Sequence, residues 1–223
     1  STQLMDKWGF LGAERLYNGP WQAFERALGR LLIHKGWEHV AIIGGSGDHG
    51  ADVIASSGSN EMVFQVKYRR SGGAVGKEII EDIKRAMEFY NIANGCVVTN
   101  GYLSKGALEY LNHLKKNAYN ISFIEGRKLL KIYDDLPLRP INNPEMREYQ
   151  ALALDSILNA FNKGDRSALL VLATGLGKTF VAGKFLSQVY RKYKDMKVLI
   201  LANKDDLIKQ FDLAIWPHLP KSV

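Results

Sequence analysis

The stretch that decides the fold is Gly50 to Lys67, GADVIASSGSNEMVFQVK. Two runs of alternating apolar residues, Ala51 to Ser56 and Met62 to Lys67, flank the small polar cluster Ser57 to Asn60. Alternation of this kind is typical of strands, and small polar residues between two such runs are typical of a turn. The stretch therefore predicts a β-hairpin.

The hairpin carries an acid on one strand and a polar pair on the next. Asp52 lies near the start of the first strand. Because side chains alternate between the faces of a strand, Gln65 and Lys67 point to one face, and Phe64 and Val66 point to the other. An Asp and a Lys on neighbouring strands can be an ordinary surface pair, so the hairpin indicates a site only if its surroundings support one.

Composition sets broad limits. The chain has 223 residues, 46% of them apolar and 24% charged, which predicts one or two ordinary globular domains. We expect a cytoplasmic protein without a membrane span, because no apolar run reaches about 18 residues and the N-terminus lacks a signal-peptide pattern. The single cysteine, Cys96, predicts a thiol in the core. The net charge of +7 is compatible with a polyanionic partner but does not establish one.

The first 135 residues predict an α/β domain. The turn at 44–50 is so rich in glycine that its backbone must bend tightly or approach another segment closely. Helical spacing predicts helices over 20–35, 76–91 and 104–116, the last with Ser104 as its N-cap, and short apolar runs predict further strands over 37–43, 95–99 and 121–124.

A second domain is predicted after a linker. Prolines are frequent between 134 and 144 and no periodicity is present, so we assign 136–145 to the linker. Residues 146–223 then predict a helix over 146–162, a buried strand over 168–172, a helix ending near Tyr190 and a second buried strand over 198–202.

Between the first of these strands and its helix lies Ala173-Thr174-Gly175-Leu176-Gly177-Lys178-Thr179. A glycine-rich turn that opens a helix places backbone N–H groups around phosphates, with Lys178 on the β- and γ-phosphates and Thr179 on Mg²⁺. The usual pattern has a glycine where this chain has Leu172, so the match is incomplete by one position.

This second region resembles the opening of a superfamily 2 helicase motor, most closely the motors of restriction enzymes. The resemblance rests on Met146-Arg147-Glu148-Tyr149-Gln150, the loop and the run 198–202, and it covers 141–223. The acidic box of such motors lies beyond this stretch, so we expect a truncated RecA-like lobe that by itself hydrolyses ATP negligibly. The resemblance implies that 203–210 contacts nucleic acid and that ATP with Mg²⁺ is bound by Gln150, which reads adenine, and by Arg147, Thr174, Gly175, Gly177, Lys178 and Thr179.

The first region resembles the Mrr-type restriction endonucleases of the PD-(D/E)xK fold over about 20–132. The matching motifs are Gly47-Asp48-x-Gly50-x-Asp52, Gln65-x-Lys67, Val97-Val98-Thr99 and Trp21-Gln22-Ala23-Phe24-Glu25-Arg26. The resemblance implies that Glu25 helps to line the site and that Gln65 replaces the second acid of the motif.

The chemistry of such a site can be argued from its residues. Hydrolysis of a phosphodiester needs a cation on the phosphate and an activated water. Asp52, the side-chain oxygen of Gln65 and the carbonyl of Val66 are oxygen ligands suited to Mg²⁺. Lys67 is placed to position or deprotonate the water, and Glu25 would be an outer ligand through water. Gln in place of a carboxylate removes one negative charge and weakens metal affinity.

Four further residues lie within or close to these motifs in the sequence. Asp48 is expected to fix the glycine-rich turn and His49 to face solvent. Arg69 and Arg70 either face phosphates or form a solvated charge cluster.

The leading hypothesis is a metal-dependent endonuclease domain of an ATP-dependent restriction enzyme, coupled to a helicase-type translocase. Its partner would be double-stranded DNA, and cutting both strands would need two active sites, which favours a homodimer. One alternative is a DNA-binding clamp that does not cut, although a clamp needs no metal ligands. The other is a nuclease of recombination or repair, which the sequence hardly separates from host defence.

Overall fold

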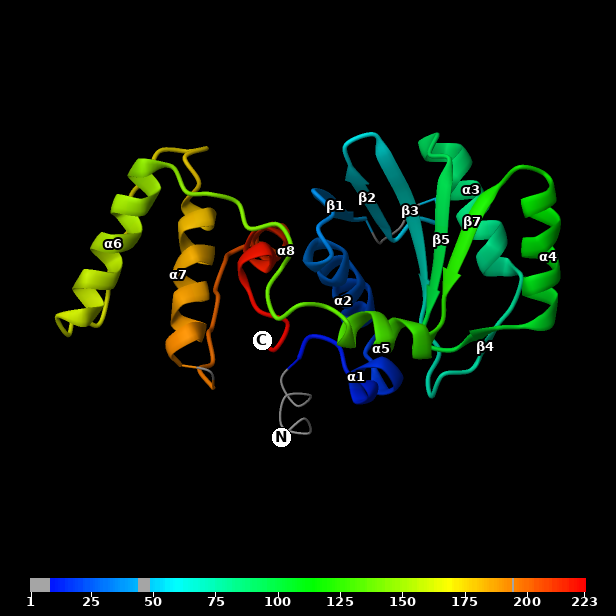
Figure 1. The fold of residues 1–223 in the computed structure, drawn as a ribbon, viewed down its shortest axis with the longest axis horizontal. Coiled ribbons are helices and arrows are strands. Elements are labelled where there is room, and N and C mark those ends of the chain that lie inside the picture. The colour runs from blue at the N-terminus through cyan, green and yellow to red at the C-terminus, as the bar shows by residue number, and fades with distance from the viewer. Residues whose placement is uncertain (1–8, 44–48, 194) are drawn as a thin grey trace. The chain divides into compact units, whose positions relative to one another are not determined.

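The computed structural model describes residues 9–43, 49–193 and 195–223 (Figure 1). The chain forms two compact units, the first ending at Pro137 and the second beginning at Leu138, and each is taken by itself below. Within the described ranges, no helix is long and apolar enough to cross a membrane.

The first unit is built on a five-stranded mixed sheet with the strand order β1-β2-β3-β5-β7. The first three strands are antiparallel, and β3, β5 and β7 are parallel. The predicted hairpin is confirmed as β2 and β3, which pair from Val53 opposite Phe64 to Ser57 opposite Asn60. The strands are β1 (His39–Ile42), β2 (Val53–Ser57), β3 (Asn60–Lys67), β5 (Asn94–Thr99) and β7 (Asn120–Ile124).

Helices cover both faces of this sheet (Figure 1). Each parallel connection crosses over through one helix, so α3 and α4 share a face. The Ser104 hydroxyl accepts a hydrogen bond from the Ala107 N–H at 3.2 Å, which confirms the predicted N-cap. The opposite face is covered by α1 (Ala13–Asn18), α2 (Trp21–His34) and α5 (Gly126–Asp134), and the crossover helices are α3 (Glu78–Tyr90) and α4 (Lys105–Lys116).

In the described part of the first unit, four elements were not predicted. They are α1, α5 and a two-stranded parallel pair of β4 (Ala74–Val75) with β6 (Tyr102–Leu103). Each strand of the pair has only two residues, which is too short for a period of two to show in the sequence.

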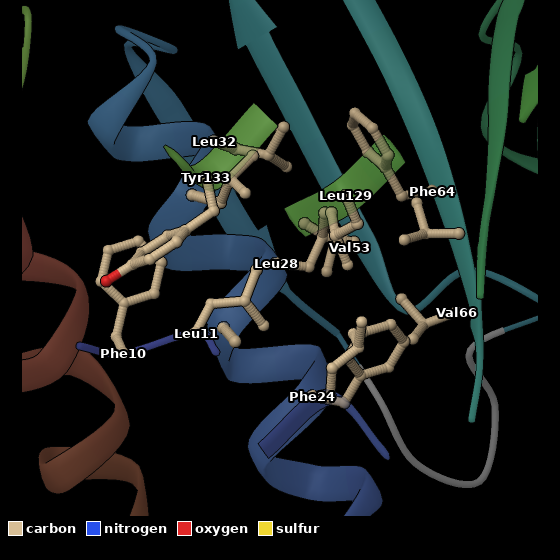
Figure 2. Close-up of a cluster of buried hydrophobic side chains, with 14 of the residues drawn as sticks. Phe10, Leu11, Phe24, Leu28, Leu32, Val53, Phe64, Val66, Leu129 and Tyr133 are labelled. Carbon is tan, nitrogen blue, oxygen red and sulfur yellow. The ribbon is translucent and has the colours of Figure 1, made fainter. Parts of the chain in front are cut away.

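The core on the α2 face explains the direction of the site residues. Figure 2 shows Phe24 and Leu28 of α2 beside Val53 and Val66 of the hairpin. Phe64 lies in the same cluster, whereas Val63 lies in the cluster under α3 and α4. Side chains of β3 therefore alternate as predicted.

Cys96 of β5 is buried in the first of these cores and forms no disulfide. Burial raises the pKa of its thiol to about 11. The predicted core thiol is confirmed.

The second unit contains α6 (Glu148–Asn162), α7 (Lys178–Lys192), α8 (Asp205–Ile215) and the 3₁₀ turn η2 (Trp216–His218). Its buried apolar side chains come from these elements and their flanks: Leu154, Val181, Leu186, Ile215, Trp216 and Leu219.

The two strands predicted in this unit do not form, and that prediction was wrong. The segments 168–172 and 198–202 have no strand assignment, and Leu169 and Leu199 are 89% and 81% exposed. A strand exists only where a neighbouring strand satisfies its backbone N–H and C=O groups. Nothing in the described part of the chain pairs with either segment, so an apolar sequence alone does not make them strands.

Candidate active site

Asp52 is the buried centre of the candidate site. Its side chain is 6% exposed, and its backbone N–H donates to the carbonyl of Phe64 at 2.9 Å. Its carboxylate Oδ2 accepts hydrogen bonds from the Val66 N–H at 2.6 Å and from Gln65 Nε2 at 2.8 Å. Asp52 directly precedes β2, and the hairpin register brings it against Gln65 and Val66 of β3.

Gln65 leaves an acceptor without a partner at this point. Its Nε2 donates to Asp52 and lies 3.4 Å from the Val66 carbonyl oxygen, whereas its Oε1 is buried and makes no hydrogen bond within the described residues. A buried acceptor without a partner is costly, so it calls for an unseen one. A cation beside the Asp52 carboxylate would satisfy it.

The donor set matches a hard divalent cation. Carboxylate, amide and carbonyl oxygens are the ligands that Mg²⁺ prefers. In the described ranges, no three His, Cys, Asp or Glu side chains gather in a way that could hold a metal. The oxygens of Asp52, Gln65 and Val66 would therefore hold the ion with a single carboxylate.

Lys67 lies two residues beyond Gln65 on the same face of β3, where it pairs in register with Thr99 of β5. The side chain is partly exposed. Its ammonium makes no ion pair or side-chain hydrogen bond with a described residue, so no neighbouring carboxylate neutralises it.

Glu25 lies on α2, directly after the buried Phe24, and is partly exposed. Phe24 packs in the core cluster that contains Val53 and Val66, the neighbours of Asp52 and Gln65 (Figure 2). The helix is therefore anchored against the hairpin that carries the site, while covering the face opposite Gln65 and Lys67.

The glycine-rich turn ends close to α3. Gly50 has φ +88, and a Cβ atom placed there would lie 2.6 Å from the carbonyl oxygen of Asp82. The glycine-rich sequence predicted either a tight bend or a close approach to another segment, and Gly50 makes such an approach. His49 is exposed, as expected, and its ring stacks on Phe89 with 3.6 Å between ring centroids. Asp48 lies outside the described residues.

Asn100 is a positioning residue that the sequence analysis missed. It is 1% exposed, accepts from the Arg69 N–H at 2.7 Å and donates to the Arg69 carbonyl at 2.6 Å. This pair of hydrogen bonds fixes the backbone just after Lys67. A polar residue directly after the buried strand β5 was the signal. The Arg69 guanidinium pairs with Glu78 at 3.4 Å and Arg70 is exposed.

In the second unit, Gln150 contacts the glycine-rich loop. Gln150 is 7% exposed, and its Nε2 donates to the Leu176 carbonyl at 3.1 Å while its Oε1 accepts from the Arg147 N–H at 3.0 Å. A Cβ on Gly177 would lie 2.6 Å from Gln150 Nε2. The structure therefore joins the predicted Gln to the predicted loop.

The loop itself is held by its lysine. Lys178 Nζ donates to the carbonyls of Leu172 at 2.8 Å and Ala173 at 3.3 Å. Gly175 has φ +84 and Gly177 φ +85, a backbone region that glycine adopts most readily. Thr174 is exposed and Thr179, on the first turn of α7, is partly exposed.

Two family models match the chain. The Mrr_cat model, described as a restriction endonuclease, matches residues 16–133, and a model described as the res subunit of type III restriction enzymes matches residues 143–222. A stretch of 64 residues is 33% identical to the endonuclease subunit of the type I restriction enzyme EcoAI from Escherichia coli. That stretch is 29% of this chain and 8% of the relative.

Two solved structures are similar to part of the chain. The protein of unknown function AF1548 has a TM-score of 0.39 and 17% identity over 64% of this chain and 78% of its own. The MspJI restriction endonuclease in complex with a 27-mer oligonucleotide has a TM-score of 0.38 and 21% identity over 53% of this chain and 29% of its own. Because the Mrr_cat model matches more than half of the residues, the chain belongs to that restriction endonuclease family.

Proposed function

We propose that this restriction endonuclease family member hydrolyses the phosphodiester backbone of double-stranded DNA at Asp52, with Mg²⁺ as its cofactor. One observation carries the proposal: the buried Oε1 of Gln65, beside a buried carboxylate, has no hydrogen-bond partner among the residues that the structure describes. That arrangement has a physical reason if a cation binds there, and none in a clamp that only holds DNA.

The metal would be held by the Asp52 carboxylate, Gln65 Oε1 and the Val66 carbonyl. When bound, it supplies charge that stabilises the phosphate and the developing oxyanion. The Val66 N–H keeps the carboxylate in place at 2.6 Å. With only one carboxylate among these three ligands, the site binds metal weakly, and one ion is favoured over two.

Lys67 would act on the water. It lies on the same face of β3 as Gln65 and pairs with no carboxylate of the described residues, so it is available to orient the attacking water and to exchange a proton with it. Glu25 lies on the helix that covers the opposite face of β3, so we do not assign it a contact to the metal. Asn100 would keep Lys67 in place by fixing the backbone at Arg69.

We further propose that residues 1–135 form the nuclease domain, 136–145 the linker and 146–223 the start of a helicase-type motor. The match to the res subunit model at 143–222 supports the motor. Lys178, Thr179 and the loop backbone would bind the phosphates of ATP with its Mg²⁺, and Gln150 would contact adenine. The intact protein would then be an ATP-dependent restriction enzyme, acting as a homodimer for double-strand cuts.

Plasmid nicking tests the active site. We expect Mg²⁺ or Mn²⁺ to support nicking of supercoiled plasmid, and Asp52→Asn and Lys67→Ala to abolish it. Lys105→Ala is the matched control, because this lysine is exposed on α4. Undiminished cleavage by either site variant would overturn the assignment, and DNA binding without cleavage by the wild type would support the clamp.

The restriction role needs a separate comparison. Methylated and unmethylated plasmids of one sequence are offered to the protein under the same conditions. A rate that depends on methylation supports restriction, and equal rates favour a repair or recombination nuclease.

A further inference from the structure

The second unit contains a cavity in which positive side chains gather. Its volume is about 260 Å³, and its walls come from the segment before α6, from α7 and from η2. Three permanent cations line it, namely Arg139, Lys184 and Arg191, together with His218. Aspartate and glutamate are missing from the described residues of the lining.

Neutral groups hold two of these cations in place. Arg139 Nη1 donates to the Ser187 hydroxyl at 3.0 Å, and Lys184 Nζ donates to Asn143 Oδ1 at 2.8 Å. In the described ranges, Arg139, Lys184 and Arg191 form no ion pair. Arg139 and Lys184 are therefore held by neutral groups, without an ion pair to any described carboxylate.

The positive charges of these side chains repel one another. Burial, and then the charge of Arg191, lowers the pKa of Arg139. The same two causes lower the pKa of Lys184, against an opposing effect of Glu145. Like charges that are held together in a partly buried cavity raise the free energy of the unit, and a bound anion would reverse this.

His218 supplies an independent observation. It is 4% exposed, lines the cavity, and its Nδ1 has no hydrogen-bond partner within the described residues. Its ring packs against Gly183 of α7, where a Cβ atom would collide with it. An imidazole nitrogen so deeply buried is rarely left without a partner.

We infer that this cavity is a binding site for an oxyanion of the phosphate class. The cavity is several times larger than the roughly 30 Å³ of one water, so a phosphate group fits inside it. Guanidinium and ammonium groups on several sides match the tetrahedral oxygens of phosphate.

This site is separate from the nucleotide loop. Its lining includes no residue of 173–179, and Lys184 and Arg191 follow Lys178 by about 9 Å and about 20 Å along the axis of α7 at 1.5 Å per residue. The occupant is either a free phosphate ion or a phosphate group of a DNA backbone. Both present the same chemistry to the cavity.

Phosphate is titrated into the whole 223-residue chain at constant ionic strength, and the His Cε1–H resonances are followed by NMR. His218→Gln identifies the resonance of His218. We expect it to shift saturably, and its pKa to rise from about 4 because the anion offsets the nearby Lys184. Lys184→Gln and Arg139→Gln should weaken binding about tenfold or more, whereas Lys163→Gln, an exposed position with the same charge change, should not.

A second titration with a short DNA duplex separates the two sources. If the occupant is a backbone phosphate, the duplex produces the His218 shift, and Lys184→Gln reduces the salt dependence of DNA binding by about one ion. If it is a free ion, only inorganic phosphate produces the shift. The inference fails if neither ligand shifts His218 saturably in the wild type, or if Lys163→Gln weakens the shift as much as Lys184→Gln.

Discussion

Similar apolar sequences are buried in the first unit and exposed in the second. In the first, Val97 and Val98 of β5 are fully buried between two paired strands and two layers of helices. In the second, Leu169 and Leu199 lie in equally apolar runs but are 89% and 81% exposed. An apolar run becomes a buried strand only when neighbours complete its sheet.

The difference extends to the candidate sites. Asp52 and Gln65 are fixed by hydrogen bonds between paired strands, so their geometry follows from the completed sheet. The glycine-rich loop of 173–179 follows a described segment that is not a strand, and its Lys178 donates hydrogen bonds to carbonyls of the loop and of that segment. We therefore expect the first site to be preorganised, and the second to depend on whatever covers its apolar segments.

The largest expected effect is the loss of nicking on substitution of Asp52, which tests whether the first site is preorganised. Asp52→Asn keeps the shape and removes the charge that would hold the metal, so nicking should fall by about 10³-fold or more. Nicking rates at saturating Mg²⁺ measure this, with Glu109→Gln on α4 as the exposed acid control. Less than a tenfold loss would mean that the sheet does not preorganise a site at Asp52.

A matched pair of leucines tests the contrast in packing. Leu28→Ala removes a side chain that is 1% exposed and should lower the free energy of unfolding by about 2–5 kcal/mol. Leu199→Ala, at an 81% exposed position, should change it by less than about 0.5 kcal/mol. Urea unfolding measures both. A comparable loss for Leu199 would show that its segment is covered in solution.

Acid should affect the second unit in particular. Burial, and then the charge of Lys184, lowers the pKa of His218 from 6.5 to about 4. Between these pH values the unfolded chain binds a proton and the folded unit does not. The free energy of unfolding therefore decreases as the pH is lowered through this window, and His218 leaves it unchanged above the window. The loss at pH 5 is about 2 kcal/mol.

Urea unfolding at pH 7 and pH 5 measures this loss in the wild type and in His218→Gln. The variant should lose less stability than the wild type on acidification. Equal losses would remove His218 as the cause.

The smallest expected effect concerns Gln65. Gln65→Glu adds the carboxylate that the site lacks, and the Mg²⁺ concentration for half-maximal nicking should fall about tenfold. The variant also loses the donor to Asp52, so without metal it should be less stable than the wild type. An unchanged Mg²⁺ requirement would argue against Gln65 as a ligand.

Periodicity predicted most of the helices and the strands of the main sheet. The helices α2, α3, α4, α6 and α7 and the strands of the main sheet lie close to their predicted ranges, because burial of one face imposes a period on the sequence. The pair of β4 with β6 was missed because strands of two residues carry too little pattern, whereas α5 and α8 were missed although both are longer than the strands of the main sheet. The strands at 168–172 and 198–202 were wrongly predicted, because pairing is not a local property.

The sequence by itself determined the hairpin, the alternation that points Gln65 and Lys67 to one face, and the glycines of the loop at Gly175 and Gly177. These follow from local backbone sterics and from side-chain period. Only the tertiary structure decided which oxygen of the site has no partner, that Asn100 fixes the backbone after Lys67, and that cations distant in sequence meet around His218. Such facts depend on register and on contacts between distant segments, which no local pattern of residues encodes.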